Sequence, residues 1–444
     1  MVRFAANNKT MKRIPIAFLV LMSLNVSNSC QKPDSIDPFK HFSMERNQIV
    51  VISDIHLGAD LTYAECKKNL PYLEEFLNRV RFSSNVKELV IAGDLLDEWF
   101  VPANIDTYQG KDQADFVRRI AEANKGVIDV LKKIIREKRI LVTYVPGNHD
   151  LTISEANVEL ILPGINQKRD PELGLGTYSP QGYPYIAIEH GHRYNFFCAP
   201  DPISNQDIAP GTITPPGYFF TRIAALFVAQ GHPDKAADTL PEVTRNATGD
   251  ESQNLLFAYW GMWDWTLKNF RILNKYDEQL IVTNVDGFTG TYAVEDLVPY
   301  QEIPGGFIDL DLYHGIQDNW LQRQTHNHVQ VPIPTLQAIA GSALSTETDA
   351  QAATQYFLNP RSTVRIVVFG HSHDARIQSS FDHLQQKCIY VNSGTWIDNN
   401  PNKTTMNFVI ITPQEEDCCS KTSVKLYNFQ DEVFTLMAED SVRL

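Results

Sequence analysis

Five short clusters of Asp, Asn and His residues stand out in the sequence, each directly after a stretch predicted to be a strand. They are Asp54-Ile55-His56, Gly93-Asp94-Leu95-Leu96-Asp97, Gly147-Asn148-His149-Asp150, His190-Gly191-His192 and Gly370-His371-Ser372-His373. Carboxylate, imidazole and amide groups are ligands for ions such as manganese, iron or zinc. Because α/β folds place their sites at strand ends, we expect these side chains to gather around metal.

Each cluster alone has a simpler explanation. An Asp that follows a strand can cap the next helix, and a single His such as His373 can be an ordinary surface residue. Five clusters of ligand-type residues at five strand ends have no simple structural explanation, and burying them without a metal would be costly. Their combination therefore predicts a metal centre.

Strand-like and helical segments alternate through the first part of the chain. Apolar, β-branched strands are predicted at 49–52, 89–91 and 140–145, and helical periodicity covers 66–82 and 112–138. This order predicts an α/β fold with buried, parallel strands. Later strands without long helices between them favour a partly antiparallel sheet, and their ranges are 364–369, 388–391, 408–411 and 424–427.

Residues 200–360 interrupt this regular pattern and are expected to form an insertion or lid. The segment is rich in Pro and aromatic residues, and 251–276 is predicted to be a helix with an aromatic face. Such rings usually pack the core of their own segment, which is the favoured interpretation. The alternative is a lid whose rings contact an apolar or ring-bearing substrate.

The N-terminus has the order of features of an export signal. A basic start at Met11-Lys12-Arg13 precedes the apolar run Ile14 to Leu24, and small and polar residues follow up to Cys30. Cys30 resembles the lipidated cysteine of bacterial lipoproteins. We therefore expect a signal peptide at 1–30, a tether at 31–45, and an exported protein that is periplasmic or anchored to the outer membrane through Cys30.

Composition narrows the classes of partner. The chain has 444 residues and a formal net charge of −14, with 43% hydrophobic residues, as in an ordinary globular protein. An acidic surface repels polyanions, so no nucleic-acid partner is expected. The cysteines after Cys30 are scattered and form no CxxC pair, so buried free thiols are the default interpretation.

The ordered set of clusters resembles the calcineurin-like metallophosphoesterases, whose pattern is D-x-H, G-D-x-x-D, G-N-H-D/E, H and G-H-x-H. The resemblance covers roughly residues 46–200 and 362–400, and includes an Asn-x-Gly turn at Asn392-Ser393-Gly394. It implies a β-sandwich of mixed sheets flanked by helices. The core would comprise 46–199 and 361–444, with the insertion at 200–360 between them.

The resemblance also implies roles for individual residues. Two divalent ions (manganese, iron or zinc) would be held by carboxylate, amide and imidazole ligands: Asp54, His56 and His373 for the first ion, Asn148, His190 and His371 for the second, and Asp94 between both. A hydroxide between the ions would attack phosphorus. His149 would assist the leaving group, Asp150 would orient His149, and Asp97 would support the bridging region.

The substrate is less well defined by the sequence. Ser53 to Gly58, Gly93 to Trp99 and His190 to Tyr194 resemble the branch that contains UDP-2,3-diacylglucosamine pyrophosphohydrolase, although the expected export and the long insertion depart from that branch. Arg193 is a candidate phosphate-binding residue, with a surface ion pair as the alternative. Three hypotheses follow: a phosphoesterase on a phosphorylated small molecule, a pyrophosphohydrolase on a nucleotide- or lipid-linked substrate, and a surface binding lipoprotein with a structural metal site.

Overall fold

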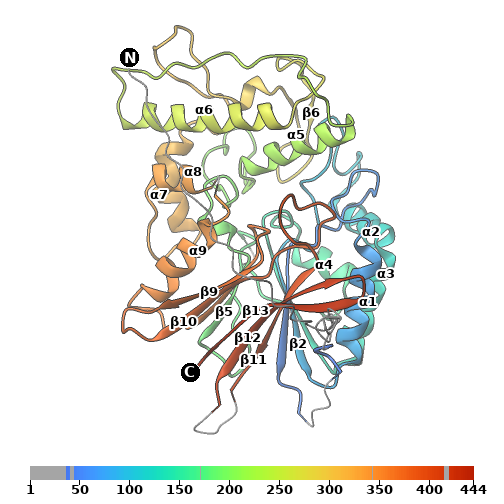
Figure 1. The fold of residues 1–444 in the computed structure, drawn as a ribbon. Helices are drawn as coiled ribbons and strands as arrows, with labels where there is room; N and C mark the ends of the chain where they lie inside the picture. The colour runs from blue at the N-terminus through green and yellow to red at the C-terminus, as the bar shows by residue number, and fades with distance from the viewer. Residues whose placement is uncertain (1–36, 41–44, 171, 343, 415–419) are drawn as a thin grey trace, which may run out of the picture. The chain divides into compact units, whose positions relative to one another are not determined.

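Two mixed β-sheets pack against each other in the computed structural model, which describes residues 37–40, 45–170, 172–342, 344–414 and 420–444. The larger sheet has the spatial order β13 (Val433–Val442), β12 (Thr422–Gln430), β11 (Asn407–Thr412), β1 (Gln48–Ile52), β2 (Val86–Ala92), β3 (Leu141–Val145) and β4 (Asn166–Gln167). The smaller sheet has the order β5 (Ile186–Ile188), β8 (Ile366–Phe369), β10 (Lys387–Asn392) and β9 (Arg376–Phe381). Helices flank these sheets, so the expected fold class is confirmed (Figure 1).

Strand direction follows the sequence pattern. β1, β2 and β3 are parallel, as the alternation of strands and helices predicts. β11 joins β1 antiparallel, and β12 and β13 continue that antiparallel arrangement. In the smaller sheet β5, β8 and β10 are parallel and β9 is antiparallel. The later strands do not form a sheet of their own: β8 and β10 lie in the smaller sheet and β11 and β12 in the larger one, and each sheet is partly antiparallel.

Side chains alternate between the two faces of each strand and build two apolar layers. On β1, Ile49 and Val51 enter the layer between the sheets, where Val368 and Val391 come from the smaller sheet. Their neighbour Val50 faces the opposite way, into the layer under the helices. Because both faces of the central strands are buried, their sequences are continuous apolar runs. The same burial holds the carboxyl ends of these strands in place.

Four helices cover the first half of the core: α1 (Leu70–Phe82), α2 (Gln113–Ala123), α3 (Lys125–Glu137) and α4 (Glu155–Ile161). Figure 1 shows α1 and α3 side by side along the larger sheet. The prediction of one long helix over 112–138 is wrong, because the helix is interrupted at Asn124, where φ is −113° and ψ is 33°. The Asn124 amide donates to the carbonyl oxygens of Gly58 and Ile120, which ties the break to the loop after β1.

Among the described residues the insertion contains five α-helices, a short hairpin, a 3-10 helix and a π-helical turn: α5 (Gly217–Ala229), α6 (Glu251–Asn269), α7 (Ile316–His326), α8 (Thr335–Gly341), α9 (Glu347–Gln351), β6 (Ile281–Val282), β7 (Thr291–Tyr292), η2 (Glu295–Leu297) and η3 (Ala352–Phe357). Helix α6 ends before the predicted limit of 276, because the chain leaves the helical conformation at Phe270. Tyr259 and Trp263 are fully buried, which agrees with the interpretation of these rings as core residues, whereas Trp265 is 56% exposed and departs from it.

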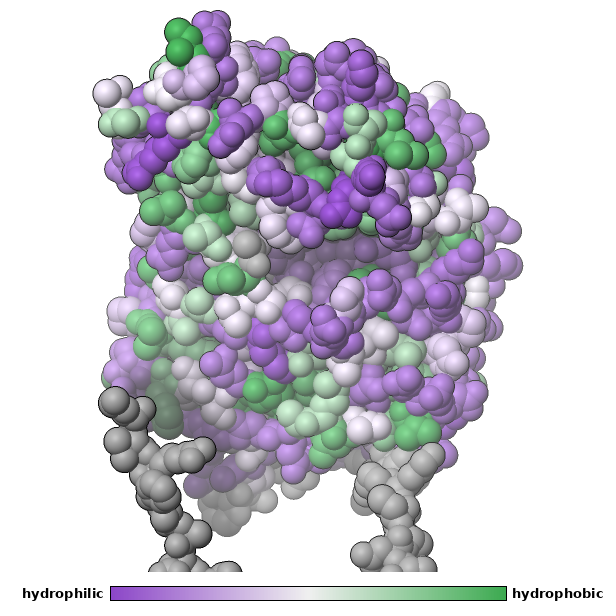
Figure 2. All heavy atoms as spheres, turned by 45° about the horizontal axis from the view of Figure 1, so that its top comes forward, coloured by the Kyte–Doolittle hydropathy of each residue, from purple (hydrophilic) through white to green (hydrophobic). Residues whose placement is uncertain are grey.

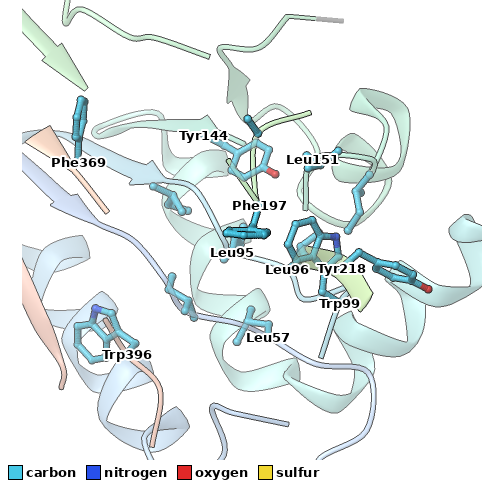
Figure 3. Packing of buried hydrophobic residues seen from close by; sticks show 14 of the residues in the cluster. Leu57, Leu95, Leu96, Trp99, Tyr144, Leu151, Phe197, Tyr218, Phe369 and Trp396 are labelled. Atoms are coloured by element: carbon cyan, nitrogen blue, oxygen red, sulfur yellow. The ribbon is translucent and has the colours of Figure 1, made fainter. Parts of the chain in front are cut away.

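Apolar contacts join the insertion to the core. Tyr259 stacks on Phe197 with ring centroids 5.7 Å apart, and Tyr218 of α5 meets Trp99 edge-on at 6.3 Å. Figure 3 shows Phe197 and Trp99 close to Leu95, in the turn that follows β2. The insertion therefore packs directly on a turn that carries candidate ligands.

Part of the expected tether already contacts the core. Phe39 is buried, and its ring lies 5.9 Å from Phe76 and 5.8 Å from Phe408. The expected signal peptide and Cys30 lie outside the described residues, so these predictions, and the domain limits that depend on them, stay predictions. Within the described part of the chain, no helix has both the length and the apolar character needed to cross a bilayer.

Replacement of Trp396 by Ala tests the packing beneath the site. Trp396 is fully buried and its ring centroid lies 5.0 Å from that of Phe76. Its loss leaves a large cavity, so we expect Trp396→Ala to lower the free energy of unfolding by about 3–5 kcal/mol. Phe82→Ala is the matched control, because Phe82 is 68% exposed. Urea unfolding compares the two, and equal effects would contradict this account of the core.

Candidate metal centre

The candidate ligands lie in turns at the carboxyl ends of five strands. Asp54 and His56 follow β1, Asp94 follows β2, and Asn148 follows β3 in the larger sheet. His190 follows β5, while His371 and His373 follow β8 in the smaller sheet. The two sheets therefore contribute to one site, and packing between them sets the distance between its halves.

Backbone strain marks these turns. Five candidate ligands that are not glycine have a left-handed backbone: Asp54 (φ 52°), His56 (φ 55°), Asp94 (φ 53°), His371 (φ 67°) and His373 (φ 54°). This conformation is rare for residues with a side chain, and strain of this kind concentrates at functional sites. The surrounding packing holds these residues in a costly conformation that turns their side chains towards one another.

Glycines beside the ligands allow the turns to approach closely. A Cβ atom on Gly93 would collide with the ring of His190, one on Gly147 with the carboxylate of Asp94, and one on Gly370 with the carboxylate of Asp54. Each of these glycines therefore brings a second turn into contact with a ligand, which explains why three of the five sequence clusters begin with glycine.

Asp54, His56 and His373 form the first group. Nε2 of His373 lies 3.1 Å from Oδ1 of Asp54 and 3.3 Å from Nε2 of His56. The backbone N–H of His371 donates to Oδ1 of Asp54 at 3.0 Å, which fixes the carboxylate. All three side chains offer ligand atoms within 4.8 Å of one another.

Asn148, His190 and His371 form the second group, around Oδ1 of Asn148. This oxygen lies 3.1 Å from Nε2 of His190 and 2.9 Å from Nδ1 of His371. Oδ2 of Asp94 lies 3.1 Å from Nε2 of His190 and 3.6 Å from Nε2 of His56, so it stands between both groups. The structure thus brings together all seven side chains predicted as metal ligands.

The donor set fits divalent cations. Nδ1 of His190 is 2.9 Å from the carbonyl oxygen of Ala92, to which it donates, so Nε2 keeps a lone pair that faces the oxygens of Asp94 and Asn148. Asp54 and Asp94 are almost completely buried. Burial alone would raise the pKa of Asp94, but the charge that His190 and His149 carry whenever they are protonated in place of a bound cation holds it well below its ordinary value. Converging acceptor atoms around buried carboxylates form a site with a strong preference for cations.

His149 lies at the edge of the metal centre and is held by Asp97. Nδ1 of His149 is 2.9 Å from Oδ1 of Asp97, and Trp99 stacks on the ring with centroids 4.9 Å apart. The second Asp97 oxygen is 3.1 Å from Nδ1 of His56. Burial lowers the pKa of His149, but the charges of Asp97 and Asp94 together with the hydrogen bond to Asp97 more than offset this, and the net shift is upward.

Asp150 has a different contact from the one expected. Its carboxylate accepts the backbone N–H groups of Leu95 at 2.8 Å, Leu96 at 3.1 Å and Gly147 at 2.7 Å. Asp97, and not Asp150, contacts the His149 ring. The reason is that Asp150 is completely buried between the turns after β2 and β3, where unpaired backbone donors need an acceptor.

Arg193 does not contact the candidate ligands. Its Nε lies 2.9 Å from Oε2 of Glu189, and a second guanidinium nitrogen donates to Thr177 at 2.9 Å. Arg193 therefore forms an ion pair, as in the alternative that the sequence left open, but the pair is largely buried and not on the surface, because the Arg193 side chain is 11% exposed and that of Glu189 is 1% exposed. Sequence reasoning missed Glu65, whose Oε2 lies 3.3 Å from Nδ1 of His56, because nothing in its local sequence marks it.

With this geometry in place, comparison with known proteins assigns a class. Residues 48–216 match the family model of calcineurin-like phosphoesterases. This stretch is similar to a calcineurin-like phosphoesterase domain and covers less than half of the chain. The family consists of metal-dependent hydrolases, which agrees with the groups of Asp and His side chains at the site and supports the assignment of the chain as an enzyme. The matched span ends before His371 and His373, which only the fold brings to the site. No curated protein matches the chain.

A matched pair of glycine variants tests the close approach at the site. Gly147→Ala places a Cβ against the Asp94 carboxylate, so we expect manganese affinity to fall by about tenfold or more. Gly261→Ala in α6 is the control, because nothing lies within 4 Å of its added Cβ. Alanine favours a helix, so this control should keep its metal affinity and gain up to about 1 kcal/mol of stability. Calorimetric titration with manganese and thermal melting measure both effects, and unchanged affinity in Gly147→Ala would refute the argument.

A buried carboxyl near His149 gives a pH prediction. Glu98 is fully buried and accepts hydrogen bonds from Thr152, Tyr108 and Gln113. Burial raises its pKa to about 7 despite these donors, against an ordinary value of 4.5. The folded state therefore binds the proton more tightly, and its stability falls as pH rises from 4.5 to about 7.

Glu98→Gln should remove this part of the pH dependence. Between pH 5 and 7 we expect the urea midpoint to fall less steeply with pH for Glu98→Gln than for the wild type. The difference between the two slopes should correspond to the titration of about one group. Glu122→Gln is the control, because Glu122 is exposed on α2. Identical slopes in wild type and Glu98→Gln would contradict the assignment of a neutral Glu98.

Proposed function

We propose that the protein hydrolyses a phosphate ester of a small molecule at a site for two divalent cations. The observation that carries this proposal is the pair of ligand groups that share Asp94: Asp54, His56 and His373 on one side, and Asn148, His190 and His371 on the other. A single structural ion would need only one such group. Manganese, iron and zinc all accept this mixture of oxygen and nitrogen ligands.

The charge of the site favours a phosphate. Two divalent cations against the carboxylates of Asp54 and Asp94 leave a net charge of about +2. Bound cations would polarise the phosphoryl oxygens and stabilise the negative charge that develops on them in the transition state. The acidic surface of the whole protein does not oppose this, because the local charge decides what binds.

His149 is assigned to the leaving group. Asp97 holds Nδ1 of the ring, and among the described residues no hydrogen bond to Nε2 is present, so Nε2 remains available to a ligand. The side chain is 12% exposed, at the edge of the buried cluster. Hydrolysis breaks the P–O bond to the alcohol, water supplies the new P–O bond, and a proton from Nε2 neutralises the departing oxygen.

Purified protein with added manganese tests this function on three substrates: p-nitrophenyl phosphate, its bis ester and a nucleoside diphosphate sugar. Hydrolysis of either nitrophenyl ester, lost after chelation and restored by manganese, is the expected result. Cleavage of the diphosphate alone would assign a pyrophosphohydrolase instead. Tight metal binding without hydrolysis of any of the three would contradict the proposal and favour a binding protein.

Two variants separate metal binding from proton donation. Asp94→Asn should lose manganese, as measured by plasma mass spectrometry, together with activity. His149→Ala should keep its manganese and lose about 10²–10⁴-fold in kcat on an alkyl phosphate, because the alkoxide needs a proton. The loss on p-nitrophenyl phosphate should be much smaller, since nitrophenolate leaves without one. Equal losses on both esters would show that His149 is not the acid.

A further inference from the structure

A cavity of about 390 Å³ opens beside His371, between the metal centre and the insertion. Its walls come from the turn that carries His371 and Ser372, from Phe197 in the core, and from helices α5 and α6 of the insertion. Figure 2 shows that the face turned forward from the top of Figure 1 is hollowed and bordered by both hydrophilic and hydrophobic residues. A phosphate ester bound at the metal centre would have this cavity next to it.

The insertion side of the cavity is apolar. Phe220 of α5 lies edge-on to Phe197 with ring centroids 5.3 Å apart, and Met262 and Trp265 of α6 continue the wall. Trp265 is 56% exposed, although neighbouring rings of the same helix are buried. An exposed Trp on a cavity wall leaves apolar surface that a ligand can cover.

The residues that line the cavity do not provide the positive charge that a second phosphate group would need there. No Lys or Arg is among the described residues that line the cavity, and its titratable groups are His371, Glu347 and Cys198. A nucleotide or diphosphate leaving group would bring negative charge into a space that has no cation of its own. The organic part of the substrate is therefore expected to be neutral.

Glu347 is the polar group of this lining. It is 9% exposed, and its Oε2 accepts a hydrogen bond from the Asn195 amide at 2.6 Å. Its other oxygen, Oε1, is buried and has no hydrogen-bond partner among the described residues. Burial raises the pKa of Glu347 to about 8 although the Asn195 amide opposes this, so the carboxyl is mostly neutral at pH 7. An unpaired buried polar atom costs free energy that a ligand hydrogen bond would recover.

We propose that this cavity receives the organic part of the phosphate ester and selects a compact, neutral, largely apolar alcohol or phenol, with Glu347 as the hydrogen-bond partner of one polar atom of that group. This rests on the proposed function, since it places the phosphate at the metal centre. The volume of the cavity agrees with a compact organic group. A cavity of about 150 Å³ holds benzene, so this cavity admits a few rings but no pair of long acyl chains.

Two alkyl phosphates test the cavity without changing the chemistry: 2-phenylethyl phosphate and ethyl phosphate have leaving groups of similar basicity. With the manganese-loaded full chain, we expect kcat/KM to be at least about tenfold higher for the phenylethyl ester. Trp265→Ala should remove most of this preference, because it should lower kcat/KM for the phenylethyl ester much more than for ethyl phosphate. Phe82→Ala is the control, because Phe82 is an aromatic residue that is 68% exposed, against 56% for Trp265, and lies outside the cavity; this variant should keep the preference.

Binding of the corresponding phosphonates, followed by calorimetry, separates the two proposals. Preferential binding of phenylethyl phosphonate, weakened by Trp265→Ala, supports the cavity even if neither ester is hydrolysed, a result that would contradict only the proposed function. Hydrolysis of both esters with equal kcat/KM would overturn the inference and leave the proposed function intact.

Glu347 is tested with a substrate that carries a hydroxyl, 2-(4-hydroxyphenyl)ethyl phosphate. Glu347→Gln keeps a neutral donor and should change KM by less than about threefold, whereas Glu347→Leu keeps the size but removes the hydrogen bond. We expect Glu347→Leu to raise KM for the hydroxylated ester about tenfold or more relative to its effect on KM for 2-phenylethyl phosphate. Equal effects of Glu347→Leu on both esters would overturn the role of Glu347.

Discussion

The convergence of buried acceptor atoms at the strand ends is the interaction on which the rest of the structure depends. Oδ2 of Asp94 stands 3.1 Å from Nε2 of His190 and 3.6 Å from Nε2 of His56, and lone pairs face lone pairs throughout this cluster. Atoms of this kind repel one another unless protons or cations lie between them. The protein holds them together through packing, and that packing prepares the site for cations before they bind.

The packed β-sandwich holds these acceptor atoms close to one another. Central strands with both faces buried cannot shift without exposing apolar side chains on one face or the other. Asp150 then links the turns after β2 and β3 through three backbone N–H groups. Left-handed residues such as Asp54 and His371 persist because the layers around them allow no relaxed alternative. Packing in the core therefore holds these residues at the site in strained backbone conformations.

The core and the insertion contribute different parts of the function. The core supplies the metal ligands and His149, whereas α5 and α6 supply the apolar wall beside His371. Buried rings such as Tyr259 and Trp263 anchor the insertion, and Trp265 on the same helix is left exposed in the cavity. In the proposed function the core would carry out the chemistry at phosphorus, and the insertion would select the alcohol.

The sequence by itself predicted most strands of the two large sheets, although not β4, β9 or β13, together with the seven candidate ligands and their grouping into short clusters, because strand periodicity and ligand chemistry are local properties. It could not determine that Asn124 divides one predicted helix, that Asp97 and not Asp150 contacts His149, or that Arg193 pairs with Glu189. Those outcomes depend on which donors and charges meet across turns that are far apart in the chain. Glu65 and the cavity beside His371 likewise arise only when separate segments pack together, since no local pattern encodes a distance between them.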